Sequence, residues 1–161
     1  MSDLLNLLVS FAGERLVARG WKLAVAESCT GGWIGKAITD VSGSSAWFER
    51  GFVVYSNQAK VDLLGVKPAT LEAYGAVSEP TAREMADGAL ARSRAQLAVA
   101  VTGIAGPDGG SREKPVGTVF LAWAARDEET RVQRMRFLGD RAEVRLQSVQ
   151  SALQGVVDLL S

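Results

Sequence analysis

The sequence predicts an α/β protein, a three-layer α/β/α sandwich built on a mixed, mostly parallel sheet of about five strands. Segments with helical spacing of apolar residues alternate along the chain with short apolar runs typical of buried strands. The last two strand segments are joined by only four polar residues, 126–129, which favours an antiparallel hairpin. The length of 161 residues suits a single domain spanning 1–161.

The first half of the chain opens with a helix, because apolar residues recur at helical spacing and Gly20 follows them. Ser56 is a good N-cap for a later short helix, and Gly65 closes that helix. The elements predicted in this half are a helix over 2–19, a strand over 21–26, a helix over 33–40, a strand over 46–55 and a helix over 57–64.

The second half continues the alternation and ends on a long helix. Ser78 opens a helix with Pro80 in its first turn, and Asp140 caps the last helix. The elements predicted here are a helix from 78 to about 93, a strand over 97–101, a glycine-rich loop over 102–117, strands over 118–125 and 130–137, and a final helix from 140 to about 160.

Bulk composition narrows the class of partner. Lys plus Arg and Asp plus Glu number 18 each, so the net charge gives no electrostatic argument for nucleic acid or an anionic membrane. No run approaches the ~20 apolar residues of a membrane span, and no basic segment precedes the first apolar residues as in a signal peptide. The one cysteine, Cys29, rules out an internal disulfide and fits a reducing, cytoplasmic setting.

The sequence contains no histidine, and this excludes a Ser-His-Asp catalytic triad or a Cys-His dyad formed within the chain. One cysteine and no imidazole also make a zinc site improbable, since only carboxylates remain as ligands. Carboxylates favour harder cations. A serine activated by a lysine would need no metal and no redox cofactor, so we expect neither.

The first candidate loop follows the strand predicted over 21–26. Ser28 lies just ahead of a helix, where unpaired N–H groups favour a phosphate or a developing oxyanion. The residues expected to supply these donors are Cys29, Thr30, Gly31 and Gly32. The plain alternative is that Ser28 or Thr30 only caps the helix and the glycines only form a turn. Cys29 is a rival nucleophile, although a lone cysteine at such a corner is more often a small buried hydrophobe.

The second candidate loop contains Tyr55, Asn57 and Lys60. A serine needs a base to be a useful nucleophile, and Lys60 can serve if desolvation lowers its pKa. The alternative is a solvated helix lysine, and spacing alone does not decide between the two. Tyr55 suits stacking on an aromatic ligand or hydrogen bonding, but a strand-end tyrosine is more often a packing residue.

The third candidate loop runs from Thr102 to Gly110 and has four glycines, whose backbone N–H groups can cradle an anion. It is not a Walker loop, because it lacks the terminal Gly-Lys-Ser/Thr. Its glycines at 103, 106, 109 and 110 do not fit the Gly-x-Gly-x-x-Gly dinucleotide pattern. The alternative is a long mobile surface loop.

Two arginines one turn apart, Arg141 and Arg145, begin the last helix. Both suit bidentate binding of a phosphate or carboxylate. The alternative is a solvated helix face with Glu143 as a charge partner, which the sequence favours slightly for Arg145 and more strongly for Arg141.

Taken together, the three loops resemble the CinA C-terminal domain family, whose stand-alone members are nicotinamide-nucleotide amidohydrolases. The resemblance covers nearly the whole chain, and the matching stretches are 26–32, 51–60 and 101–119. It implies an α/β/α sandwich that hydrolyses nicotinamide mononucleotide (NMN) to nicotinic acid mononucleotide and ammonia. It also implies a homo-oligomer, a dimer or larger.

The resemblance implies roles for individual residues. Ser28 matches the family nucleophile and Lys60 its general base, and the N–H groups after Ser28 would hold the oxyanion. The residues expected to bind the nucleotide are Cys29, Thr30, Gly31, Gly32, Tyr55, Asn57, Thr102, Gly103, Ala105, Gly106 and Arg145, with the glycine-rich loop and Arg145 holding its phosphate. Two other functions stay open: a non-catalytic nucleotide- or partner-binding domain, and a serine amidase acting on another small amide.

Overall fold

The sheet is the central layer of the molecule. In the computed structural model, which describes residues 2–161, five strands form one sheet in the order β2-β1-β3-β4-β5. β1 pairs in parallel with β2 and β3, whereas β4 runs antiparallel to both β3 and β5. The strands are β1 (Leu23–Glu27), β2 (Phe48–Val53), β3 (Leu97–Gly103), β4 (Thr118–Ala125) and β5 (Arg131–Arg136). The predicted mixed five-stranded sheet is confirmed, and β4 alone of these strands runs against the others.

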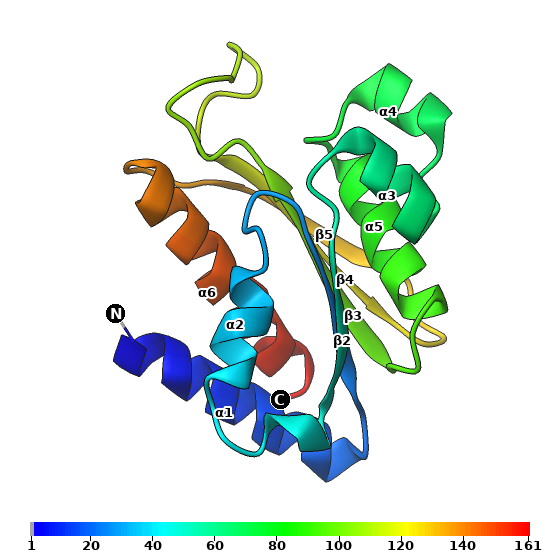
Figure 1. Cartoon of the computed structure of the whole chain (residues 1–161), viewed down its shortest axis with the longest axis vertical. Coiled ribbons are helices and arrows are strands. Elements are labelled where there is room, and N and C mark those ends of the chain that lie inside the picture. Colours follow the sequence, from blue (N-terminus) through cyan, green and yellow to red (C-terminus); the bar gives the residue numbers. More distant parts are fainter. Residues whose placement is uncertain (1) are drawn as a thin grey trace.

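Helices cover both faces of the sheet (Figure 1), so the predicted three-layer sandwich is confirmed. One outer layer consists of α1 (Ser2–Arg19), α2 (Trp33–Thr39) and α6 (Arg141–Leu159). The other consists of α3 (Asn57–Leu64), α4 (Pro68–Tyr74) and α5 (Glu79–Ala91). No helix within residues 2–161 has the length and apolar character needed to cross a membrane.

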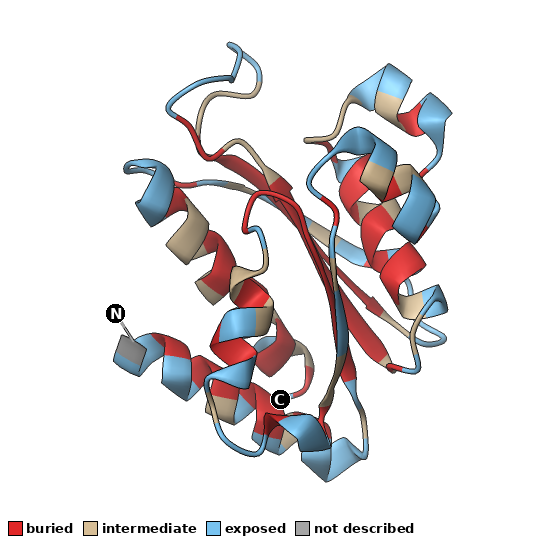
Figure 2. Cartoon of the chain, in the orientation of Figure 1, coloured by how far each residue is buried: buried red, intermediate tan, exposed pale blue. Residues whose placement is uncertain are grey.

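Strand side chains alternate between two hydrophobic clusters, one on each face of the sheet. Leu23 and Val25 of β1 pack with α1, α2 and α6, whereas Ala24 and Ala26 face α5. Both faces are covered, and for this reason β1 and β3 are buried along almost their whole length (Figure 2). Small alanine side chains on one face let α5 lie close to the sheet.

The structure departs from the prediction chiefly at one strand and one helix, and the bounds of the other predicted elements shift by at most two residues. The strand predicted over 46–55 is the shorter β2, because residues 44–46 form a turn of 3-10 helix that leads into it. Helix α4 was not predicted, since Thr70 is its only buried residue and its apolar residues give no clear helical face. Pro68 at its first turn was the available signal.

Candidate active site

Three neighbouring strands end at the same edge of the sheet. The N–H of Val54, just after β2, donates to the carbonyl of Glu27 at 2.8 Å, and the N–H of Ser28, just after β1, donates to the carbonyl of Val101 at 3.1 Å. Parallel strands whose carboxyl ends lie side by side form the usual ligand edge of an α/β sheet. The three loops singled out in the sequence therefore meet at one place, at the top of the sheet in Figure 1.

Ser28 and Lys60 meet at this edge, although 32 positions separate them in the chain. The Nζ of Lys60 lies 2.9 Å from the Oγ of Ser28. The lysine is 1% exposed and the serine 7% exposed, so bulk water does not separate the pair. This is the geometry that an amine base and a hydroxyl nucleophile require.

Backbone carbonyl groups fix the amine of Lys60. The side chain of Ser56 caps α3 by accepting from the N–H of Ala59 at 3.0 Å, and this cap sets the helix that places Lys60 one turn further on. The Nζ then donates to the carbonyl oxygens of Val54 at 2.9 Å and Tyr55 at 3.1 Å. A neutral amine has two N–H groups and one lone pair. With both N–H groups donated to carbonyls, the lone pair is left for the hydroxyl of Ser28.

Burial sets the protonation of the two titratable groups beside Ser28. Desolvation lowers the pKa of the Lys60 amine, which favours the neutral form that a general base needs. Desolvation also raises the pKa of the Cys29 thiol to about 11, so Cys29 stays protonated at neutral pH. A protonated thiol is a poor nucleophile, and this argues against Cys29 in that role.

The start of α2 already holds a negative charge, that of the buried carboxylate of Glu27. Its Oε1 accepts from the N–H of Gly32 at 3.2 Å, the N–H of Ile34 at 2.8 Å and the hydroxyl of Thr30 at 2.7 Å. Its Oε2 accepts from the N–H of Gly35 at 3.0 Å. The helix terminus therefore neutralises an internal anion, and the N–H of Gly32 does not face a ligand.

The remaining N–H groups of this loop differ in their use. The N–H of Gly31 donates to the carbonyl of Ser28 at 3.1 Å and closes a turn. Within residues 2–161, the N–H groups of Cys29 and Thr30 donate to no backbone or side-chain oxygen. Two adjacent donors directly after a nucleophile are the usual source of an oxyanion hole.

A cavity of about 320 Å³ opens over the Ser28–Lys60 pair. The sequence-predicted residues on its wall are Ser28, Cys29, Tyr55, Asn57, Lys60, Thr102, Gly103, Ala105 and Gly106. Tyr55 is 64% exposed and lies at the cavity rim. The Oγ1 of Thr102 donates to the carbonyl of Ala76 at 2.9 Å, which ties the turn before α5 to the end of β3.

Four predicted residues lie off this wall. Thr30 is fully buried against Glu27, while Gly31, Gly32 and Arg145 line a neighbouring hollow of about 610 Å³. Arg145 donates from Nε to the carbonyl of Cys29 and from Nη2 to that of Thr30, both at 3.1 Å. Its guanidinium also lies 5.4 Å from the ring centroid of Trp33. Because its donors are used in this way, Arg145 supports the loop of Ser28 from outside the cavity.

Five further residues line the wall that were not among the expected ligand-binding residues: Ala76, Val77, Ile104, Asp108 and Arg141. Ile104 and Asp108 belong to the candidate loop over 102–110, and Arg141 was weighed as an anion ligand. Ala76 and Val77 carry no chemical signal, since only the Thr102 hydrogen bond brings their turn to the site. Arg141 was interpreted as part of a solvated helix face. Its Nη1 instead donates to the carbonyl of Gly106 at 2.8 Å, which holds it against the glycine-rich loop.

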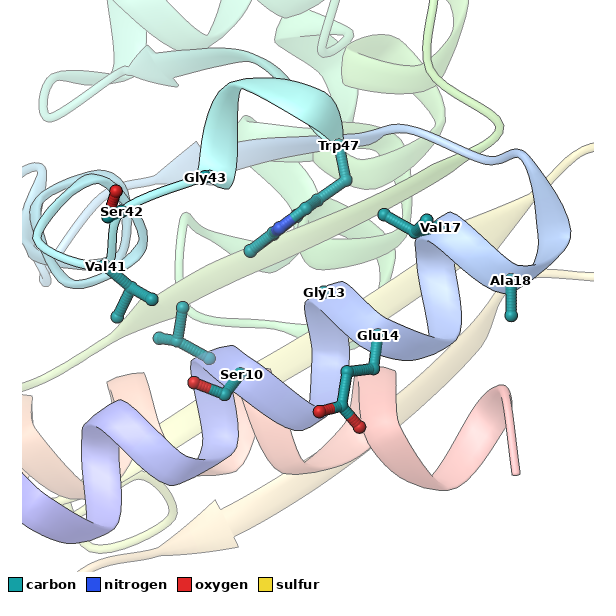
Figure 3. Close-up of a pocket in the computed structure, with 10 residues that line it drawn as sticks. Ser10, Gly13, Glu14, Val17, Ala18, Val41, Ser42, Gly43 and Trp47 are labelled. Carbon is teal, nitrogen blue, oxygen red and sulfur yellow. The ribbon is translucent and has the colours of Figure 1, made fainter.

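A larger hollow of about 480 Å³ lies elsewhere, between α1 and the segment from Val41 to Trp47 (Figure 3). Trp47 lies over α1 at Gly13, where an added Cβ would meet its indole nitrogen at 2.5 Å. Glu14 is the only titratable side chain on its wall. The serine–lysine pair lies in the smaller cavity. Across residues 2–161, no group of three or more His, Cys, Asp or Glu side chains is placed to hold a metal ion.

Fold and site together define an α/β/α protein with a buried serine–lysine pair at the carboxyl ends of its parallel strands. A family model described as the CinA C-terminal domain matches residues 6–160. The chain belongs to the CinA C-terminal domain family, which confirms the resemblance found in the sequence.

Relatives in sequence and structure agree with this assignment. Nicotinamide-nucleotide amidohydrolase PncC of Escherichia coli strain K12 is 58% identical over 142 residues, which cover 88% of this chain and 86% of that protein. A CinA-like protein of Akkermansia muciniphila is 55% identical over 143 residues, but these are only 34% of its length. The crystal structure of competence/damage inducible protein CihA from Agrobacterium tumefaciens matches with a TM-score of 0.95 at 49% identity, covering 98% of this chain and 96% of that one.

Proposed function

We propose that this chain is a nicotinamide-nucleotide amidohydrolase that converts NMN and water to nicotinic acid mononucleotide and ammonia. The contact of 2.9 Å between the Oγ of Ser28 and the Nζ of the buried Lys60 is the observation that supports this most strongly. The 58% identity to a protein named for this activity supports the choice of substrate.

The first half of the reaction forms an ester on Ser28. Lys60 takes the hydroxyl proton as Oγ attacks the carboxamide carbon, and the N–H groups of Cys29 and Thr30 stabilise the oxyanion. The tetrahedral intermediate collapses when the C–N bond breaks. Lys60 returns its proton to the leaving nitrogen, which departs as ammonia, and the amine is neutral again.

The second half repeats the same proton transfers with water. Lys60 takes a proton from a water molecule that attacks the ester carbon. The C–O bond to Ser28 then breaks, and the proton returns to Oγ. The product is the carboxylic acid, and no electron is gained or lost by the protein. One base therefore serves both halves of the reaction.

The test is a comparison of three amides: NMN, nicotinamide riboside and free nicotinamide. We expect ammonia and nicotinic acid mononucleotide to form in equal amounts from NMN, and free nicotinamide to react far more slowly. Equal rates for all three substrates would indicate a serine amidase of broad range. Tight binding of NMN without any ammonia would indicate a non-catalytic nucleotide-binding domain.

We also infer a setting for the molecule. The chain acts as a single domain in the cytoplasm, on a small nucleotide and in a homo-oligomer, a dimer or larger. The exposed apolar side chains of Leu4, Leu7 and Phe11, which share one face of α1, support an association surface. Sedimentation velocity tests this, because a monomer at micromolar concentration would contradict it.

A further inference from the structure

The proposed substrate carries a phosphate, so the site needs a cation that faces the cavity. Lys60 and Arg141 are the two basic residues on its wall. The amine of Lys60 is committed to Ser28 and to the carbonyls of Val54 and Tyr55. A phosphate at Lys60 would also occupy the place of the reacting carboxamide. Arg141 is the cation that remains.

Two of the other anion sites expected from the sequence are already occupied, and the third, the glycine-rich loop over 102–110, contains no cationic side chain. Glu27 fills the start of α2, where it accepts from the N–H groups of Gly32, Ile34 and Gly35. Arg145 holds the carbonyls of Cys29 and Thr30 from the neighbouring hollow. Neither position has a positive group aimed into the cavity.

The position and the contacts of Arg141 suit it to bind a phosphate. It is the first residue of α6, which begins across the strand ends from α3, the helix of Lys60 (Figure 1). Its Nη1 donates to the carbonyl of Gly106, and this orients the guanidinium against the glycine-rich loop. In the described part of the chain it forms no ion pair with a carboxylate. Most of its five N–H donors therefore stay available to an oxyanion.

We infer that Arg141 binds the phosphate of the nucleotide and thereby makes the enzyme prefer NMN to its riboside; this inference rests on the proposed function. A guanidinium matches two phosphate oxygens at once, and a ribose separates the phosphate from the carboxamide that Ser28 attacks. Asp108 lies on the same wall and adds negative charge there. The guanidinium of Arg141 is then the one cationic group that holds the phosphate dianion. Its loss should therefore lower kcat/KM for NMN strongly.

The experiment compares kcat/KM for NMN and for nicotinamide riboside in wild type, Arg141→Gln and Arg131→Gln. Arg131 is an exposed arginine of β5 that pairs with Trp123 at the far end of the sheet, so its variant is a control for the same change in net charge. We expect Arg141→Gln to lose about 10- to 100-fold in kcat/KM for NMN, the range typical of a lost charge-assisted hydrogen bond. Its kcat/KM for the riboside stays within about twofold of wild type, as do both values for Arg131→Gln.

Two outcomes would overturn the inference. Equal losses on both substrates would mean that Arg141 only supports the loop through Gly106, and no loss on either substrate would place the phosphate elsewhere. Wild-type protein that releases ammonia from neither substrate would instead overturn the proposed function, and the inference with it. Thermal unfolding of each variant shows whether the fold is intact.

Discussion

Lys60 occupies an environment that few lysines share. Lysine is almost never fully buried unless its charge is paired, yet this side chain is 1% exposed and has only carbonyls and a serine as partners. The sequence alone did not reveal this, because the other residues of α3 are mostly exposed and the spacing is that of an ordinary surface helix. The lysine is enclosed only when the ends of β1 and β2 come together.

The pH dependence of catalysis follows from this burial. Only the neutral amine accepts the proton of Ser28, and burial lowers the pKa of Lys60 below its usual 10.5. We expect kcat/KM for NMN to rise with pH as Lys60 loses its proton, and to level off at a pH below 10.5. Lys60→Met should reduce turnover by about 10²- to 10⁴-fold and abolish this rise, as measured by ammonia release from pH 5 to 10. A variant that keeps the wild-type profile would show that the base lies elsewhere.

Glu27 is the second residue whose role the sequence did not disclose. A carboxylate just ahead of a glycine-rich helix start was the available signal, because anions are stabilised there. We expect Glu27→Gln to destabilise the fold by about 1–3 kcal/mol, since an amide cannot accept all of these N–H groups. Its kcat should also fall more than its KM rises, because the loop of Ser28 loses its anchor. Unfolding in urea and steady-state kinetics measure both effects.

The control for this change is Glu128→Gln, which neutralises an exposed carboxylate in the turn between β4 and β5. It should leave stability and kcat near wild type. A Glu27→Gln variant that behaves like this control would mean that the buried carboxylate does not position the nucleophile.

At the scale of elements, capping chemistry made most helices predictable. Asp140 forms a capping box with Glu143, and the side chains of Ser56 and Ser78 accept at the starts of α3 and α5, as their residue types indicated. Strand ends were less predictable, because an apolar run does not show where pairing stops. The strand predicted over 97–101 continues to Gly103 for this reason, where β4 pairs with it.

The contact between α3 and α5 links packing to catalysis. A Cβ added at Gly88 of α5 would lie 2.0 Å from the carbonyl oxygen of Leu64 in α3, so the two helices have to move apart. We expect Gly88→Ala to destabilise the protein by about 1–3 kcal/mol and to lower kcat, because α3 positions Lys60.

Gly155→Ala is the matched control in the opposite layer. Its Cβ would lie 2.2 Å from the ring of Trp123, far from the serine–lysine pair. It should lose stability to a similar degree and keep kcat near wild type. If both variants lose kcat equally, or neither does, the contact at Gly88 does not control catalysis through the position of α3.

At the scale of the molecule, one sheet supports two cores. β1, β3 and β4 contribute alternate side chains to the hydrophobic clusters on both faces. Unfolding of either helical layer would therefore expose apolar side chains of the strands. The sequence predicted this architecture because its buried strands read as continuous apolar runs. It did not predict the geometry of the site, because residues as far apart as Ser28 and Arg141 come together only through the strand order.

The shared sheet predicts a single cooperative unfolding transition. Tryptophan fluorescence reports mainly on the layer that contains Trp47 and Trp123, whereas far-UV circular dichroism reports on all helices. Both signals should give the same midpoint in urea. Two separate midpoints would contradict the assignment of 1–161 as one domain.

Ammonia release from NMN by wild type and by Ser28→Ala, measured side by side, tests whether Ser28 is the nucleophile of an NMN amidohydrolase. Wild type should release ammonia, whereas Ser28→Ala, still folded by circular dichroism, should release less by a factor of at least about 10³, since a covalent mechanism loses its nucleophile. A folded Ser28→Ala variant that releases ammonia at the wild-type rate would contradict this role of Ser28.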